Sequence, residues 1–166
     1  MLNREEIILL FLEDPKKLVS EIIKGNVLKS DEIRTLICEL RNPECVCLYA
    51  DYVDKSPRSD TRQGACKDPY YAYWYAYYVD KSPRSDTRKV ACKDPRYAYY
   101  YAYWVDRSPR SDTREASCKD PYWKAEYKKW ESSLNPAQLP TKLSAKPSPT
   151  FQQILWNSMR KLFWNP

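Results

Sequence analysis

Arginine and aspartate recur at fixed spacing through the middle of this chain of 166 residues, and they have the clearest capacity for binding chemistry. The segment Val53–Arg62 (VDKSPRSDTR) returns at 79–88 and at 105–114, with Arg107 in place of a lysine. A row of guanidinium groups would bind phosphates, whereas acids beside them would hold the same groups in a structural ladder of ion pairs between repeats. Aspartates recur beside the arginines, so we favour the ladder. The candidate phosphate contacts are Arg58, Arg62, Arg84, Arg88, Arg110 and Arg114.

Catalytic and metal-binding patterns are missing from the sequence. The chain has no histidine, the commonest general base and metal ligand near neutral pH, and no phosphate-binding glycine loop or nucleophile elbow. Cys38, Cys45 and Cys47 are one thiol short of a closed zinc site. The other three cysteines share one repeat position, which is typical of small residues buried between helices. We therefore predict no catalytic residues, no metal and no cofactor.

The repeat itself has a period of 26 residues. Cys66-Lys67-Asp68-Pro69 returns at 92–95 and at 118–121, each time followed by an aromatic run. An older copy precedes these, because Asn42-Pro43 stands in the same register and Lys29, Ser30 and Thr35 match residues 55, 56 and 61. Self-similarity at this period is typical of stacked helical repeats. We expect about four units over residues 27–131.

Each unit is predicted to hold a long helix and a short one. Asp68 is a suitable N-cap and Pro69 a suitable first helical residue for a helix over 70–79. The short helix begins either at Ser56 with Pro57 or at Ser59 with Asp60, and the sequence leaves both open. The tyrosine-rich run also suits a strand, but Tyr71, Ala72, Tyr75, Ala76 and Val79 form one helical stripe. The sequence thus predicts an all-α fold, a short α-solenoid of helix-turn-helix repeats.

The segments on either side of the repeats are predicted to be capping helices at the N-terminal side and a linker with a last helix at the C-terminal side. Residues 1–26 are expected to form N-terminal capping helices, with Asn3 and Glu6 as a capping box, a restart at Asp14-Pro15 and an end at Gly25. The last repeat gains lysines, as a terminal unit requires. Residues 132–149 contain four prolines and predict an extended linker. Residues 150–166 predict an amphipathic helix that docks on its own array or another copy, inserts at a partner, or lies on an anionic membrane. We favour docking.

The unit Lys67–Val79 (KDPYYAYWYAYYV) resembles the repeat of uncharacterised bacterial, phage and giant-virus proteins in which a DPxxAYxYAxxV helix alternates with a short helix. The resemblance covers roughly residues 42–131. It implies an α-solenoid of phage or bacterial origin and carries no known activity. Those proteins often have a Gly-Arg-Trp-Pro-Glu-like stretch between helices, whereas this chain has Ser56-Pro57-Arg58-Ser59-Asp60, so the second helix departs from their pattern.

The aromatic helices have a second face, opposite the packing stripe. Tyrosine, tryptophan and arginine together favour binding hot spots, although the same side chains suit packing between helices. The candidate protein-binding residues are Tyr70, Tyr73, Trp74, Tyr77, Arg96, Tyr99, Tyr100 and Tyr103.

The overall hypothesis is a non-catalytic helical repeat scaffold for protein–protein interaction, including self-association. The alternative is a nucleic-acid-binding repeat protein that uses the arginine rows and stacked aromatics. The sequence shows no apolar run long enough to span a bilayer and no cleavable signal. Together with cysteines that suit a reducing compartment, this predicts a cytoplasmic protein, in the host cytoplasm if a phage encodes it, whose partners are protein or nucleic acid rather than membrane.

Overall fold

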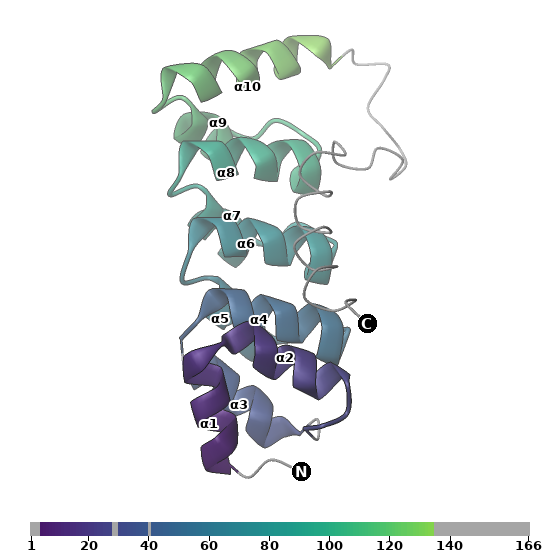
Figure 1. Ribbon diagram of the computed structural model, residues 1–166. Helices are drawn as coiled ribbons and strands as arrows, with labels where there is room; N and C mark the ends of the chain where they lie inside the picture. Colours follow the sequence, from purple (N-terminus) through teal and green to yellow (C-terminus); the bar gives the residue numbers. More distant parts are fainter. Residues whose placement is uncertain (1–3, 28–29, 40, 135–166) are drawn as a thin grey trace, which may run out of the picture. The chain divides into compact units, whose positions relative to one another are not determined.

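Long and short helices alternate along the chain (Figure 1). The computed structural model describes residues 4–27, 30–39 and 41–134, and every regular element within these ranges is helical. The predicted all-α solenoid is therefore confirmed, while the capping residue Asn3, most of the predicted linker and the predicted C-terminal helix lie outside the described residues. The long helices are α4 (Pro43–Leu48), α6 (Pro69–Tyr75), α8 (Pro95–Tyr100) and α10 (Pro121–Ser133), and the first three of them continue directly into a π-helical segment that is described below. The short helices are α3 (Asp31–Glu39), α5 (Ser59–Ala65), α7 (Ser85–Ala91) and α9 (Ser111–Ser117).

The long helices lie side by side in sequence order, and α5, α7 and α9 each pack against the long helix that precedes them and the one that follows them (Figure 1). Alanines make the close approach possible. Ala72 and Ala76 of the second unit and Ala98 and Ala102 of the third are completely buried, since a methyl group lets a neighbouring helix come near. The predicted packing stripe is confirmed at these alanines, at Tyr75 and at Val79.

The starts of the long helices are those that the Asp-Pro pairs predict. The carboxylate of Asp68 accepts hydrogen bonds from the backbone N–H groups of Tyr70 and Tyr71 at 2.8 and 3.3 Å, and Asp94 and Asp120 do the same in the next two units. In the first unit the side chain of Asn42 caps α4. Each cap satisfies amide groups that have no partner inside the helix.

Helices α5, α7 and α9 begin at the second of the two predicted positions but without a side-chain cap, whereas Ser30 caps α3 by accepting a hydrogen bond from the N–H of Ile33 at 3.2 Å. Helix α5 begins at Ser59 after Arg58, whose side chain makes no capping bond. Instead, the backbone N–H of Arg58 donates to the hydroxyl of Tyr75 at 3.1 Å, and Thr61 Oγ1 lies 2.7 Å from the same hydroxyl. Tyr101 and Tyr127 repeat this arrangement with Thr87 and Thr113. A completely buried tyrosine of each long helix thereby fixes the start of the short helix before it.

Three of the long helices widen into π-helix over their second half. These segments are η1 (Tyr49–Asp54), η2 (Ala76–Asp80) and η3 (Tyr101–Asp106). Each ends in an aspartate and is followed by a residue in the left-handed region, namely Lys55, Lys81 or Arg107, with φ of 52 to 55°. Helix α10, which has Ser132 at this position, stays α-helical. The π-helix thus occurs in those long helices that end in an aspartate, just before the chain turns sharply into the next short helix.

Replacing Lys55 with glycine should raise the free energy of unfolding by about 1 kcal/mol. A side chain in the left-handed region clashes with the following carbonyl at a cost of roughly 1–2 kcal/mol, and glycine avoids that cost. Urea unfolding followed by circular dichroism measures the change. Lys55→Ala is the control, because it removes the same charge and keeps the clash. Glycine and alanine variants of equal stability would contradict this account.

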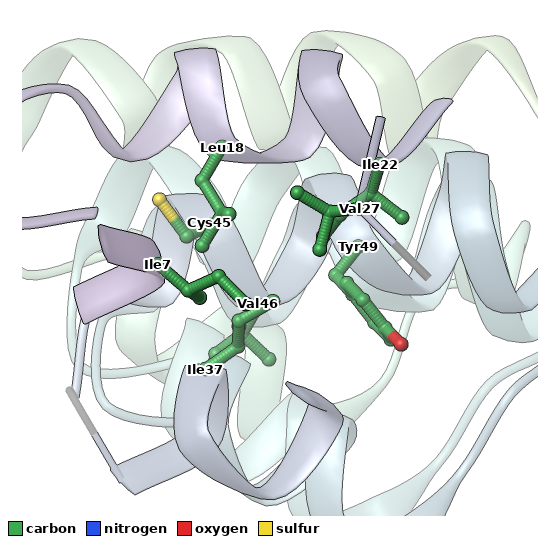
Figure 2. Close-up of a cluster of buried hydrophobic side chains, with 8 residues drawn as sticks. All are labelled: Ile7, Leu18, Ile22, Val27, Ile37, Cys45, Val46 and Tyr49. Atoms are coloured by element: carbon green, nitrogen blue, oxygen red, sulfur yellow. The ribbon is translucent and has the colours of Figure 1, made fainter. Parts of the chain in front are cut away.

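Two further helices, α1 (Arg4–Glu13) and α2 (Pro15–Ile23), cover the first unit. Asp14 accepts a hydrogen bond from the N–H of Lys17 at 3.1 Å, and Gly25, with φ of 81°, follows the end of α2, as predicted. Side chains from α1, α2, α3 and α4 converge in one apolar cluster (Figure 2). Its members are Ile7, Leu18, Ile22, Val27, Ile37, Cys45, Val46 and Tyr49.

The short helix of the first unit stands in a different register from the one that its sequence suggests. Arg34 of α3 donates to Asp54, as Arg62 donates to Asp80, so Arg34 and Arg62 are equivalent at an offset of 28 residues rather than 26. The Tyr49 hydroxyl likewise donates to the carbonyl of Ser30, the counterpart of Arg58. The predicted match of Lys29, Ser30 and Thr35 to residues 55, 56 and 61 is therefore wrong, because α3 has nine residues where α5 has seven.

Candidate interaction surface

The arginine rows divide into two classes. Arg62 donates to both oxygens of Asp80 at 2.6 to 3.1 Å, and Arg88 binds Asp106 with the same geometry. The side chains of these two aspartates are 0 and 2% exposed. Arg62 and Arg88 are thus parts of a structural ladder, as the favoured interpretation of the rows predicts, and buried aspartates bind these two candidate phosphate contacts.

The ladder also involves the tyrosines that fix the short helices. The guanidinium of Arg62 lies 5.8 Å from the ring centre of Tyr75, and that of Arg88 lies 5.5 Å from the ring centre of Tyr101. The hydrogen bonds that Arg62 donates to Asp80 raise the pKa of Arg62, so this cation keeps its charge at any ordinary pH. Arg62 and Arg88 therefore each combine a cation–π contact and a two-pronged ion pair at one place.

The other arginines of the rows are exposed. Arg58, Arg84 and Arg110 precede the short helices, where exposed aspartates at 60, 86 and 112 accompany them. Arg114 would continue the ladder, but Ser132 replaces the aspartate, and Arg114 binds Glu131 at the surface instead. A phosphate would therefore meet three separated arginines, each with a carboxylate within two residues.

Two of the predicted binding residues are buried at a junction between units. Tyr73 and Trp74 are each 5% exposed. Trp74 packs with Cys47 and Ala50 of the first unit, and Tyr73 faces Tyr97 and Tyr100 of the third, with ring centres 6.4 and 5.9 Å apart. The prediction that Tyr73 and Trp74 contact a partner is wrong, because neighbouring long helices cover both rings.

The remaining aromatic candidates are half-buried and touch rings of the next unit. Tyr70 packs on Tyr97, and Tyr77 packs on Trp104. At the last junction the rings of α8 meet those of α10, so the aromatic contacts continue from α6 to the end of the stack. The pairs at this junction are Tyr99 with Trp123 and Trp130, Tyr100 with Trp123, and Tyr103 with Trp130.

The most open part of this face lies where α8 and α10 begin. Arg96 is exposed, and its guanidinium lies 5.8 Å from the ring centre of Tyr97 and 5.9 Å from that of Trp123. Tyr122, the residue equivalent to Arg96 one unit later, is 62% exposed and contacts Trp123 edge-on. We call Arg96, Tyr100, Tyr122 and Trp123 the aromatic–arginine surface. The sequence prediction missed Tyr122 and Trp123, although their position in the last repeat, where no further unit covers them, was the available signal.

Burial keeps the tyrosines of this region neutral. Removal from water raises the pKa of Tyr99 to about 12 and raises that of Tyr100 as well. These phenols therefore offer apolar surface and hydrogen-bond donors rather than phenolate nucleophiles at physiological pH.

Burial disfavours the thiolate at three of the cysteines. Burial raises the pKa of Cys66 and of Cys92 to about 11, and that of completely buried Cys47 rises further. A thiol with a raised pKa is a poor nucleophile and a poor metal ligand, since both roles need the thiolate. Within the described part of the chain, no three cysteines or carboxylates gather in a group that suits a metal ion.

Comparison of the chain with protein-family models, curated proteins and solved structures found no match. The resemblance to the DPxxAYxYAxxV repeat proteins thus rests on the residue pattern alone. Among the helices that the structure describes, none has the length and apolar character needed to cross a membrane.

Proposed function

We propose that this chain is a non-catalytic helical repeat scaffold that binds another protein through the aromatic–arginine surface. The observation that carries the proposal is Arg96, an exposed arginine whose guanidinium lies 5.8 and 5.9 Å from the ring centres of Tyr97 and Trp123. These cation–π contacts hold the arginine in place beside solvent, where it can bind a carboxylate of a partner, and preorganised Arg, Tyr and Trp side chains dominate the affinity of protein interfaces.

The rigid setting of this surface supports the same proposal. Tyr100 and Trp123 pack on each other across the junction of α8 and α10, with ring centres 5.4 Å apart, so they lose little freedom when a partner binds. Tyr122, which is 62% exposed, adds an aromatic ring at the rim. A partner with an acidic side chain beside an apolar one fits this chemistry.

Nucleic-acid binding has weaker support. Phosphate binding along the stack needs uncompensated cations, and Arg62 and Arg88 are held by buried carboxylates. Aspartates accompany the exposed arginines that remain. Binding of a random oligonucleotide at low salt, with affinity that falls steeply as salt increases, would favour this alternative over a protein partner.

Affinity capture with the full chain as bait tests the proposal. We expect a protein captured by the wild type to bind the Arg96→Ala/Tyr122→Ser variant at least about tenfold more weakly by calorimetry, because two hot-spot side chains are lost. Arg110→Ala is the matched control, since it removes an exposed arginine outside the aromatic–arginine surface. Circular dichroism should show the same helix content in all three proteins.

Two results would overturn the proposal. One is capture of the same partner with unchanged affinity after both substitutions. The other is the absence of any captured protein that distinguishes the wild type from Arg96→Ala/Tyr122→Ser.

A further inference from the structure

A groove of about 720 Å³ lies between α1 and α3, near the first unit of the stack. Ile7, Ile33 and Leu36 form its apolar part. Its acidic part carries Asp31, Glu32 and Glu39, all of which are exposed. An apolar groove with an acidic rim suits an amphipathic helix that carries basic residues.

The exposed large apolar side chains of the described residues also lie at the ends of the stack. They are Leu9 and Leu12 on α1 (58 and 66% exposed), Ile23 on α2 (44%) and Tyr122 on α10 (62%). The middle units expose none, although terminal units of a repeat array are normally the more polar ones. Figure 1 shows α1 and α3 at one end of the helical stack and α10 at the other.

Helix α10 has an uncovered side where an inner helix would meet the next unit. Ala125 and Lys129 occupy the positions of Tyr99 and Tyr103, which pack against α10 one unit earlier. Both residues are exposed, as are Lys124 and Lys128. The uncovered side therefore presents three ammonium groups around a small apolar residue, with Tyr122 at its edge.

We propose that α10 of one copy docks into the groove between α1 and α3 of a second copy. The two surfaces have opposite charge, since Glu32, Glu39 and the Asp31 carboxylate, which pairs with Arg34, border the groove, and three lysines lie on the uncovered side of α10. Ala125 and Tyr122 supply apolar contact for Ile7, Ile33 and Leu36. The contact joins unlike surfaces, so copies add head to tail and form open chains unless the rotation between them closes a ring.

This self-association shares Tyr122 with the aromatic–arginine surface, but its test changes only lysines and glutamates outside that surface, so the failure of one proposal does not decide the other. Sedimentation velocity of the full chain should show a mean mass that rises with protein concentration at low salt. The mass should fall towards that of one chain at high salt, where exposed charges are screened.

Charge reversal tests the assigned surfaces. Glu32→Lys/Glu39→Lys and Lys124→Glu/Lys128→Glu should each weaken association about tenfold or more, since like charges then meet. A chain with all four substitutions restores opposite charges in exchanged positions and should associate again. Lys67→Glu/Lys93→Glu is the matched control, because it makes the same charge change at exposed positions in the middle of the stack.

Three outcomes would overturn the proposal. The wild type remains a single chain at all concentrations, or the four substitutions together fail to restore association in a chain with native helix content. The third outcome is that Lys124→Glu/Lys128→Glu associates like the wild type, while removal of residues 150–166 abolishes association. That result would assign the groove to the C-terminal segment instead of α10.

Discussion

Replacing Arg62 with alanine should lower the free energy of unfolding by about 3–5 kcal/mol, the usual cost of removing one partner of a buried ion pair. Asp80 has no exposed side-chain surface, and Arg62 donates to both of its oxygens. Without the guanidinium, a carboxylate remains buried with its main charge partner gone. The cation–π contact with Tyr75 is lost as well.

Arg114→Ala is the matched control, because Arg114 occupies the same repeat position with a different setting. Its partner is Glu131, and both side chains are about one-third exposed or more. Surface ion pairs contribute about 0–1 kcal/mol, so this variant should remain nearly as stable as the wild type. Urea unfolding of both variants gives the comparison, and equal losses would show that burial of the aspartate is not what makes the ladder stabilising.

The helical architecture could be predicted because its signals are local. Asp68-Pro69 and its copies define where long helices start, and the alanine spacing defines the packing stripe. Each of these features depends on residues within one or two turns of helix, which a single sequence displays directly.

The missed features depend on contacts between distant residues. No residue near Arg58 in the sequence indicates that the hydroxyl of Tyr75, 17 residues later, accepts a hydrogen bond from the backbone N–H at the start of α5. The two-residue shift of Arg34 relative to the repeat is likewise visible only through its bond to Asp54. A capping rule that considers the nearest serine or aspartate cannot find a tyrosine that performs this role from another helix.

The aromatic face was the hardest part to predict. Tyr73 and Trp74 lie opposite the stripe that packs on the short helices, yet both are buried, because long helices also contact each other along the stack. A helical wheel separates two faces, whereas a helix in this array is covered on three sides. Among the described residues, Tyr122 of the last helix is the aromatic side chain that is open to solvent.

Gly64 shows how the units adjust their packing to one another. A methyl group added at Gly64 of α5 would lie 2.8 and 3.0 Å from the two γ-methyl groups of Val46, closer than carbon atoms normally approach. Later units hold Ala72 and Ala98 at the position of Val46, and Val90 and Ala116 at the position of Gly64. The larger valine on the long helix of the first unit is therefore accompanied by a glycine at the facing position of the short helix that follows.

Gly64→Ala alone should lower the free energy of unfolding by about 1–3 kcal/mol through overpacking, despite the roughly 1 kcal/mol by which alanine favours a helix over glycine. The same substitution in a Val46→Ala chain should instead stabilise by about 1 kcal/mol, because the methyl group then fills space that valine has left. Unfolding of the four proteins gives a double-mutant cycle, with an expected coupling of about 1–3 kcal/mol.

The reversal of sign is the decisive result, since the double variant recreates the combination of Ala98 and Ala116 that the third unit already uses. If Gly64→Ala destabilises equally with valine or alanine at position 46, glycine is needed there for its backbone and not for the close contact. A stabilising effect in both backgrounds would mean that Val46 moves aside at little cost, and that the junction of α4 and α5 is looser than its completely buried side chains indicate.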